Sequence, residues 1–123
     1  MEFRFPAEEE VFRQEARAFL RDELPERRPD GEDAWPFHRN FGKKLADRGW
    51  LTLAWPKEWG GGGAGHLRQL VFNEEMAYWD APANDMGADR IGPTIMLHGT
   101  DEQKARVLPP IVRGEALWCQ GFS

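Results

Sequence analysis

The segment that most constrains the fold is the run from Leu67 to Trp79, which is apolar over most of the circumference of a helix. One face carries Leu67, Leu70, Val71, Ala77 and Tyr78, and a second face carries Phe72, Met76 and Trp79. An apolar stripe marks the side of a helix that packs on a core. A helix with two such stripes is therefore expected at the centre of a helical domain, and Pro82 is expected to end it.

One carboxylate interrupts the first of these faces. Glu74 lies among the apolar residues of that face, while Glu75 lies nearer the polar side. An apolar setting raises the pKa of a carboxylate and suits a general base. A carboxylate in such a place more often accepts structural hydrogen bonds. We therefore expect Glu74 to be buried and to have a structural role.

Two further helices are expected before this one. The first runs from Pro6, which acidic residues follow at the favoured helix N-terminus, to Pro25. The second starts at Trp35 and ends where Gly49 can adopt a left-handed conformation. The glycine-rich stretch 56–65 cannot continue regular structure and is expected to form a loop.

Two more helices are expected after the central one. Pro93 can start a short fourth helix that Gly99 ends. Thr100 to Gln103 matches a capping box, in which two side chains satisfy each other's free amides, so a fifth helix starts there. The pair Pro109-Pro110 is expected to kink the fifth helix, and Gly114 is expected to cap it.

The last residues have a different pattern. Residues 117–122 place aromatic side chains two and four apart, which is typical of a strand. A single strand leaves its hydrogen-bonding groups unpaired, and no other segment here offers it a sheet. The expected fold is all-α, a bundle of about five helices in an orthogonal or up-down arrangement, over residues 1–114. Residues 115–123 are expected to be the first strand of a truncated β-domain.

Composition excludes several functional classes. The formal net charge is −5 and the basic residues form no block, so nucleic-acid binding is not expected. No apolar run reaches the length of a membrane span and no signal peptide starts the chain, so we expect a cytoplasmic protein. The single cysteine, Cys119, excludes an internal disulfide and is expected to be a buried structural thiol. Three separated histidines do not suggest a metal site.

Several short motifs occur in order along the chain. They are Gly49-Trp50-Leu51-Thr52-Leu53-Ala54-Trp55-Pro56 with Trp59-Gly60-Gly61, Asn73-Glu74-Glu75-Met76-Ala77, Gly92-Pro93-Thr94-Ile95-Met96 through Gly99-Thr100-Asp101-Glu102-Gln103-Lys104, Leu108-Pro109-Pro110-Ile111 with Gly114-Glu115, and Trp118-Cys119-Gln120-Gly121-Phe122-Ser123. Together they resemble the N-terminal helical domain of the acyl-CoA dehydrogenase family, up to the start of the flavin-binding β-domain. The wording of the first and last motifs also looks like bacterial members that handle bulky ring-bearing CoA esters.

The resemblance implies a reaction. Such enzymes oxidise the Cα–Cβ bond of an acyl-CoA thioester with FAD and pass the electrons to an electron-transfer flavoprotein. A carboxylate removes the α-proton while the β-hydrogen leaves as hydride to the flavin. The C-terminal helical domain that usually donates this carboxylate is absent here, so we assign no catalytic residue and expect the 123-residue chain alone to be inactive.

The resemblance also implies site residues. The flavin-contacting segment of the family matches Gln120, Phe122 and Ser123 in this sequence. The wall of the acyl pocket is expected to come from the turn and fourth helix, with the candidates Met86, Gly87, Arg90, Ile91 and Thr94. Ordinary loop and helix packing is an equally good explanation of these five residues. Arg90 indicates either a polar or bulky acyl group or an outward orientation, since an arginine facing an aliphatic chain is costly.

Two other functions remain open at this point. The chain is alternatively a non-catalytic helical module or partner subunit that packs on another protein through a surface normally covered by the β-domain. A strongly apolar exposed patch favours that alternative. An acyl-CoA oxidase has the same N-terminal domain. We expect a homo- or hetero-oligomer, and the sequence leaves the acyl chain length and the electron acceptor open.

Overall fold

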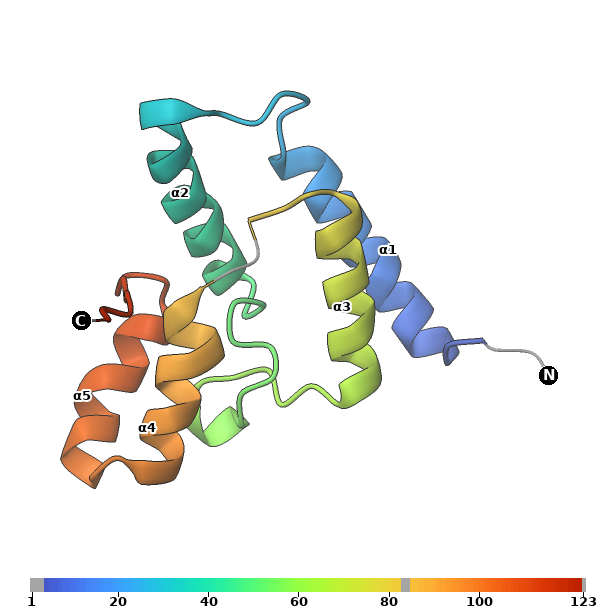
Figure 1. Cartoon of the computed structure of the whole chain (residues 1–123). Coiled ribbons are helices and arrows are strands. Elements are labelled where there is room, and N and C mark those ends of the chain that lie inside the picture. The colour runs from blue at the N-terminus through green and yellow to red at the C-terminus, as the bar shows by residue number, and fades with distance from the viewer. Residues whose placement is uncertain (1–3, 83–84, 123) are drawn as a thin grey trace.

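The computed structural model describes residues 4–82 and 85–122 (Figure 1). It contains five α-helices in this part of the chain, which confirms the predicted all-α class. They are α1 (Ala7–Glu23), α2 (Ala34–Asp47), α3 (His66–Tyr78), α4 (Gly92–His98) and α5 (Asp101–Val112). Short 3-10 turns lie at Gly31–Asp33 and Lys57–Trp59, and a π-helical turn at Gly87–Ile91 leads directly into α4.

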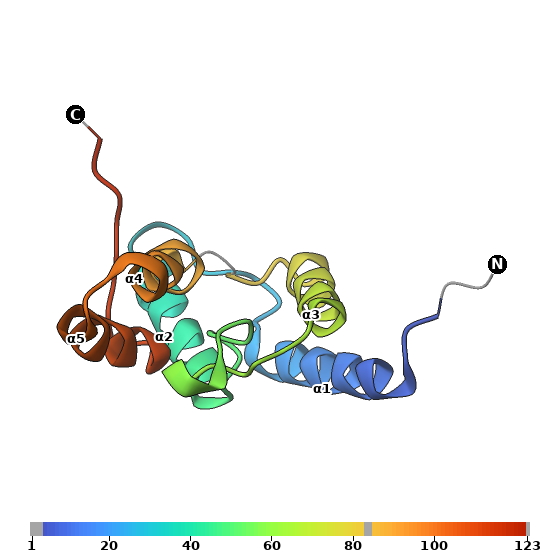
Figure 2. The same cartoon turned by 90° about the horizontal axis from the view of Figure 1, so that it is seen from below.

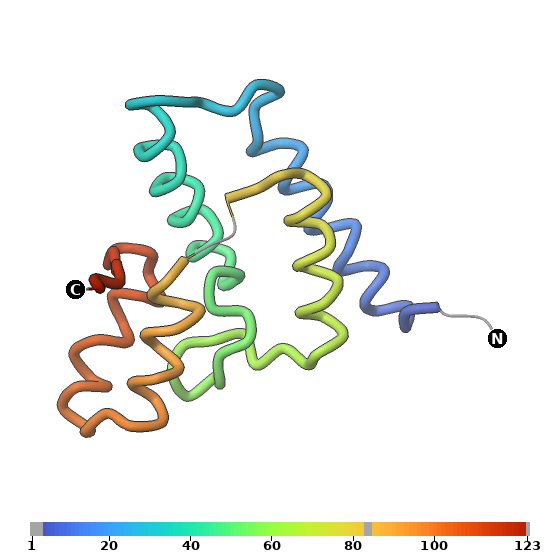
Figure 3. Tube along the Cα trace, in the orientation of Figure 1, coloured from blue at the N-terminus to red at the C-terminus, as the bar shows by residue number. Residues whose placement is uncertain are grey.

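The helices form two groups. Helices α1 and α3 pack side by side, and α4 and α5 pack side by side at the other end of the molecule (Figures 1 and 2). Helix α2 stands between α1 and α5 along the chain's path, and the long connection from α2 to α3 passes through the middle (Figure 3). The molecule is therefore an open arrangement whose central connection is a loop.

The larger core lies among α1, α2 and α3. Its buried residues come from all three helices and from the start of the α2–α3 loop: Phe12, Ala16, Phe19, Leu20, Phe41, Leu45, Trp50, Val71, Phe72 and Met76. The Trp50 indole makes edge-to-face contacts with Phe12, Phe19 and Phe72, with ring centroids 5.2 to 5.9 Å apart. Such contacts add to the burial of apolar surface, so Trp50 joins α1 to α3.

A second, smaller core lies under α4 and α5. It consists of Trp55, Ala88, Leu108 and Ile111, with Ile91 and Ile95 packed against it. The α2–α3 loop thus places one tryptophan in each core. The sequence predicted the loop but not its packing role, because residues 51–55 carry no clear periodicity.

The predicted helix ends are largely confirmed. Thr100 accepts a hydrogen bond from the Gln103 amide at 3.2 Å, and the Gln103 side chain accepts one from the Thr100 amide at 2.9 Å. Gly49 and Gly114 have φ of 73° and 65°, the left-handed conformation expected after α2 and α5. The start of the fourth helix was predicted too late, because helical structure already begins at Met86 and passes through the π-helical turn.

The prediction that α3 is central is wrong. Only one face of α3 is buried, through Val71, Phe72, Glu75 and Met76. The other face is open, with Leu67 49%, Leu70 47% and Tyr78 81% exposed. Periodicity showed two apolar faces but not that the neighbouring helices of this chain cover one of them.

The two glutamates of α3 are also reversed from the prediction. Glu75 is 2% exposed and Glu74 is exposed, so the expected burial of Glu74 is wrong and with it the reason to consider Glu74 as a base. Glu75 is buried because Arg13 and Arg17 of α1 reach its carboxylate at 3.0 and 2.8 Å. Charge pairing between helices, which the sequence did not show, decided which carboxylate is inside.

Residues 115–122 lead away from the helices without regular structure (Figure 2). Leu117, Trp118 and Phe122 are 50%, 40% and 86% exposed. Cys119 is exposed too, so the expected buried thiol is wrong. That this segment is the first strand of a β-domain stays a prediction.

Candidate functional site

The predicted acyl-pocket residues lie on and just after the π-helical turn. Gly87 is buried, Met86 and Ile91 are half-buried, and Arg90 and Thr94 are exposed. The turn starts at Asp85, whose carboxylate accepts a hydrogen bond from the Ala88 amide at 2.8 Å. That bond satisfies one of the free amides at the start of the helical run.

Gly87 brings this segment against the C-terminal residues. A Cβ atom added to Gly87 would lie 2.9 Å from Cδ1 of Trp118 and 3.3 Å from Cγ2 of Ile111. A real Cβ cannot approach that closely, so only glycine allows this contact. The structure therefore places the predicted acyl-pocket wall and the predicted flavin-contacting segment next to each other.

The exposed members of the predicted wall have distinct roles. The Thr94 hydroxyl donates to the Arg90 carbonyl at 2.8 Å, so it is used within the helix. Arg90 is exposed, which agrees with the outward orientation considered from the sequence.

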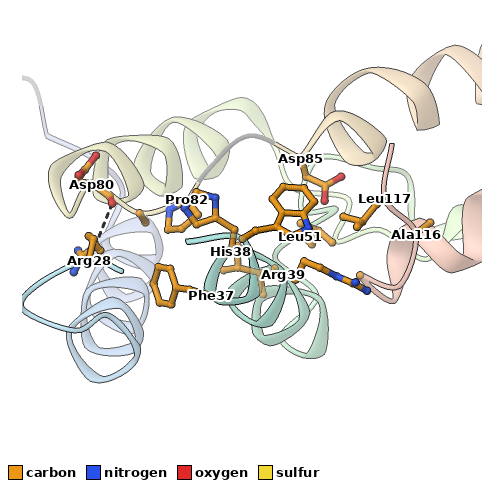
Figure 4. Close-up of a pocket in the computed structure, with 15 residues that line it drawn as sticks. Arg28, Phe37, His38, Arg39, Leu51, Asp80, Pro82, Asp85, Ala116 and Leu117 are labelled. Atoms are coloured by element: carbon orange, nitrogen blue, oxygen red, sulfur yellow. Dashed lines mark hydrogen bonds between the residues drawn. The ribbon is translucent and has the colours of Figure 1, made fainter. Parts of the chain in front are cut away.

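A cavity of about 380 Å³ lies beside this segment, between α2, residues 80–85 and residues 114–117 (Figure 4). Its lining is Arg28, Trp35, Phe37, His38, Arg39, Gly42, Leu45, Leu51, Asp80, Ala81, Pro82, Asp85, Gly114, Ala116 and Leu117. None of the predicted site residues lines it, although Asp85 adjoins Met86. The sequence gave no signal for it, because its walls come from four separate segments.

The charges around this cavity are largely tied to the protein. Arg28 donates to the main-chain carbonyls of Pro25, Trp79 and Asp80, which fixes the end of α3 to the α1–α2 loop. His38 and Arg39 line the wall formed by α2, and Trp35, Phe37 and Leu117 supply apolar surface (Figure 4). The cavity thus offers a mixed apolar and charged lining, which suits a bulky group with polar substituents better than a plain alkyl chain.

Asp85 and Asp89 form a second feature next to the turn. Both line a smaller cavity of about 180 Å³ beneath the turn, together with Gln69 and Asn73 of α3. Burial raises the pKa of Asp89, and the nearby Asp85 carboxylate raises it further. Asp85 itself caps the turn, so this pair explains a local charge balance and is not assigned a catalytic role.

The predicted flavin-contacting residues are only partly described. Gln120 and Phe122 are exposed on the C-terminal segment, and Ser123 lies outside the described residues. Their role in cofactor binding stays a prediction.

Comparison with known proteins identifies the family. The sequence pattern of the "Acyl-CoA dehydrogenase, N-terminal domain" matches residues 6–115. The chain belongs to the acyl-CoA dehydrogenase family. It is 35% identical to acyl-CoA dehydrogenase FadE26 of Mycobacterium tuberculosis over all of this chain and 32% of that protein.

Solved structures of this family have the same fold. The chain aligns with the ChsE4-ChsE5 complex from Mycobacterium tuberculosis at a TM-score of 0.80 and 34% identity, covering 94% of this chain and 30% of that one. It aligns equally well, at 0.80 and 34%, with the structure titled "Tcur3481-Tcur3483 steroid ACAD", covering 95% of this chain and 32% of that one. The acyl-CoA dehydrogenase N-terminal domain described here thus spans about a third of the length of these relatives.

Membrane insertion can be assessed on the same domain. No helix in residues 4–82 and 85–122 has the length and apolar content needed to cross a membrane. The expected cytoplasmic location stays a prediction.

Proposed function

We propose that this chain is the N-terminal part of a flavin-dependent acyl-CoA dehydrogenase. It supplies one wall of the acyl site through Met86, Gly87, Arg90, Ile91 and Thr94, and the edge of the FAD site through Gln120, Phe122 and Ser123. The observation that supports both roles is the close packing of Gly87 against Trp118, which brings the two segments together. The complete protein would form the α,β-double bond of an acyl-CoA thioester.

The residues of this chain fit a binding role. FAD, when bound, supplies the acceptor for the β-hydrogen. The side chains of Gln120 and Phe122 are exposed, so an amide and an aromatic ring are free to contact a planar ring system. The chain offers no assigned base, and the α-proton would be removed by a carboxylate from another part of the complete protein.

A bulky, ring-bearing acyl group fits best. A solved relative at 34% identity is titled a steroid acyl-CoA dehydrogenase. The cavity of about 380 Å³ beside Met86 combines Trp35 and Leu117 with charged side chains, so it can accept rings that carry polar substituents.

The complete protein is further proposed to assemble with other subunits and to pass electrons to an electron-transfer flavoprotein. The solved relatives are two-component complexes by their titles, which supports a hetero-oligomer. The exposed apolar face of α3, formed by Leu67, Leu70 and Tyr78, favours a second candidate, a non-catalytic partner subunit. An acyl-CoA oxidase also has this N-terminal domain, and no residue here favours it.

A chimera tests the main proposal. The chain replaces the matching third of FadE26, and unaltered FadE26 is produced in parallel with whatever partner subunit it requires. Flavin absorbance and dye-coupled oxidation are measured with cholanoyl-CoA, a steroid thioester, and with butanoyl-CoA, a straight-chain thioester. We expect a yellow, active chimera that prefers cholanoyl-CoA, and a colourless, inactive 123-residue chain.

Two results would contradict this proposal. Turnover by the short chain alone would show that the chemistry lies within it. A folded chimera that binds no flavin and oxidises neither thioester, while FadE26 does both, would favour the non-catalytic subunit.

A further inference from the structure

The π-helical turn leaves one main-chain carbonyl without its usual donor. The Gly92 amide donates to the carbonyl of Gly87, five residues back, and not to that of Ala88, four residues back. Residue 93, the next that could serve Ala88 in π-helical geometry, is a proline without an N–H. Ala88 is 5% exposed, so an unpaired carbonyl there would be costly.

Trp55 supplies the missing donor. Its indole Nε1 donates to the Ala88 carbonyl at 2.8 Å, and the side chain is 4% exposed. The indole ring also lies against Gly92, where an added Cβ atom would be 2.0 Å from Cζ2. One side chain from the α2–α3 loop therefore satisfies the turn and occupies the space beside the residue that follows it.

We propose that Trp55 is a positioning residue that sets the register of the acyl-pocket wall. This inference rests on the proposed function. If the turn closed as an α-helix, the Gly92 amide would pair with Ala88, and the residues on the two sides of the turn would rotate relative to each other by roughly 100°. Met86 and Gly87 would then no longer face the acyl group together with Ile91. Trp55 acts through the turn and contacts no reacting atom.

The first test measures the turn in the 123-residue chain by NMR. In the unaltered chain, the Trp55 indole N–H should exchange slowly with solvent. Trp55→Phe keeps an aromatic ring but removes the donor. We expect it to shift the amide resonances of residues 87–94 and to change the exchange rate of the Gly92 amide at least about 10-fold, because its acceptor changes.

Two further variants act as controls. Trp59→Phe makes the same change at a half-buried tryptophan of the same loop whose ring packs on the second core, and it should leave residues 87–94 unchanged. Pro93→Ala restores an N–H five residues after Ala88. The double variant Trp55→Phe with Pro93→Ala should therefore recover the resonances of the unaltered turn.

The second test measures kinetics in the FadE26 chimera with cholanoyl-CoA. Trp55→Phe should raise KM about 10-fold and change kcat less than about 2-fold, because it displaces the wall and not the reacting groups. Trp59→Phe should change neither value more than about 2-fold, and the double variant should lower KM again.

The outcomes separate the two claims. Unchanged resonances in Trp55→Phe would overturn the role of Trp55 in the turn. A changed turn with a KM no higher than that of Trp59→Phe would overturn its positioning role. An inactive unsubstituted chimera would overturn the proposed function and the positioning role with it, while the NMR result would still decide the Trp55–Ala88 bond.

Discussion

Gly92 stands where the chain has no room for a side chain. Its Cβ would lie 2.0 and 2.3 Å from atoms of the Trp55 ring. Trp55 cannot retreat, since an added Cβ at Gly61 would be 2.1 Å from the Trp55 carbonyl oxygen on the other side of the loop. At the residue scale, the second core depends on two glycines that accept one large ring.

Gly92→Ala should therefore destabilise the fold. Overpacking a dense core costs about 1 to 3 kcal/mol, and here the ring must shift and weaken its bond to Ala88. Gly42→Ala is the matched control, because nothing lies within 4 Å of its Cβ position inside α2, and it should stabilise the chain by about 0.5 to 1 kcal/mol. Urea unfolding followed by circular dichroism measures both. Equal effects of the two changes would contradict the steric argument.

Helices α1 and α3 are held together by charge as well as by apolar packing. Arg17 contacts both oxygens of Glu75, at 2.8 and 3.1 Å, and Arg13 bridges Glu75 and Glu74 at 3.0 and 2.8 Å. The Glu75 side chain is 3% exposed and that of Glu74 is 47% exposed. At the element scale, Glu75 is the residue that needs both arginines.

Glu75→Gln should lower the free energy of unfolding more than Glu74→Gln. Removing one member of a buried ion pair costs about 3 to 5 kcal/mol, and the partial exposure of Arg17 places the expected loss near the lower end. An exposed pair is worth about 1 kcal/mol or less, which bounds Glu74→Gln. Urea unfolding at pH 7 compares the two variants. A loss for Glu74→Gln as large as that for Glu75→Gln would refute this division of roles.

The contribution of Glu75 should depend on pH. The hydrogen bond from Arg17 is the main cause that lowers the pKa of Glu75 below its usual 4.5, and Arg13 adds to it while burial opposes both. Because the folded state holds the charged form more strongly, the stabilisation is complete well above pH 4.5 and is lost as the pH falls below it. The difference in unfolding free energy between the unaltered chain and Glu75→Gln should therefore shrink between pH 6 and about pH 3. A constant difference would contradict this.

At the scale of the whole molecule, the most unusual feature is the open apolar face of α3. Leu67 and Leu70 are about half exposed and Tyr78 is 81% exposed, although all three share a face. An exposed cluster of large apolar side chains commonly marks a surface that contacts another protein segment. The relatives that this chain matches are about three times its length, so more polypeptide exists in them to cover such a face.

The isolated chain should consequently self-associate. Sedimentation velocity over a range of concentrations should show dimers or larger species, and Leu67→Gln with Leu70→Gln should reduce them without lowering the melting temperature. Leu97→Gln is the control, since Leu97 is 78% exposed on α4, away from this face. A chain that stays monomeric at high concentration would show that the open face does not drive association.

The sequence by itself determined the features that depend on local chemistry. The helix class and the capping box at Thr100 follow from turn and cap residues that act on their neighbours in the chain. The family also follows from the sequence, because its motifs keep their order.

Only the tertiary structure decided which side of each helix is inside. The burial of Glu75 and not Glu74 depends on arginines about sixty residues away, and the exposure of Leu70 depends on which helices this chain contains. The π-helical turn depends on the Trp55 indole, which lies 33 residues from Ala88. Periodicity gives the apolar faces of a helix, but the partners that cover them come from distant parts of the chain.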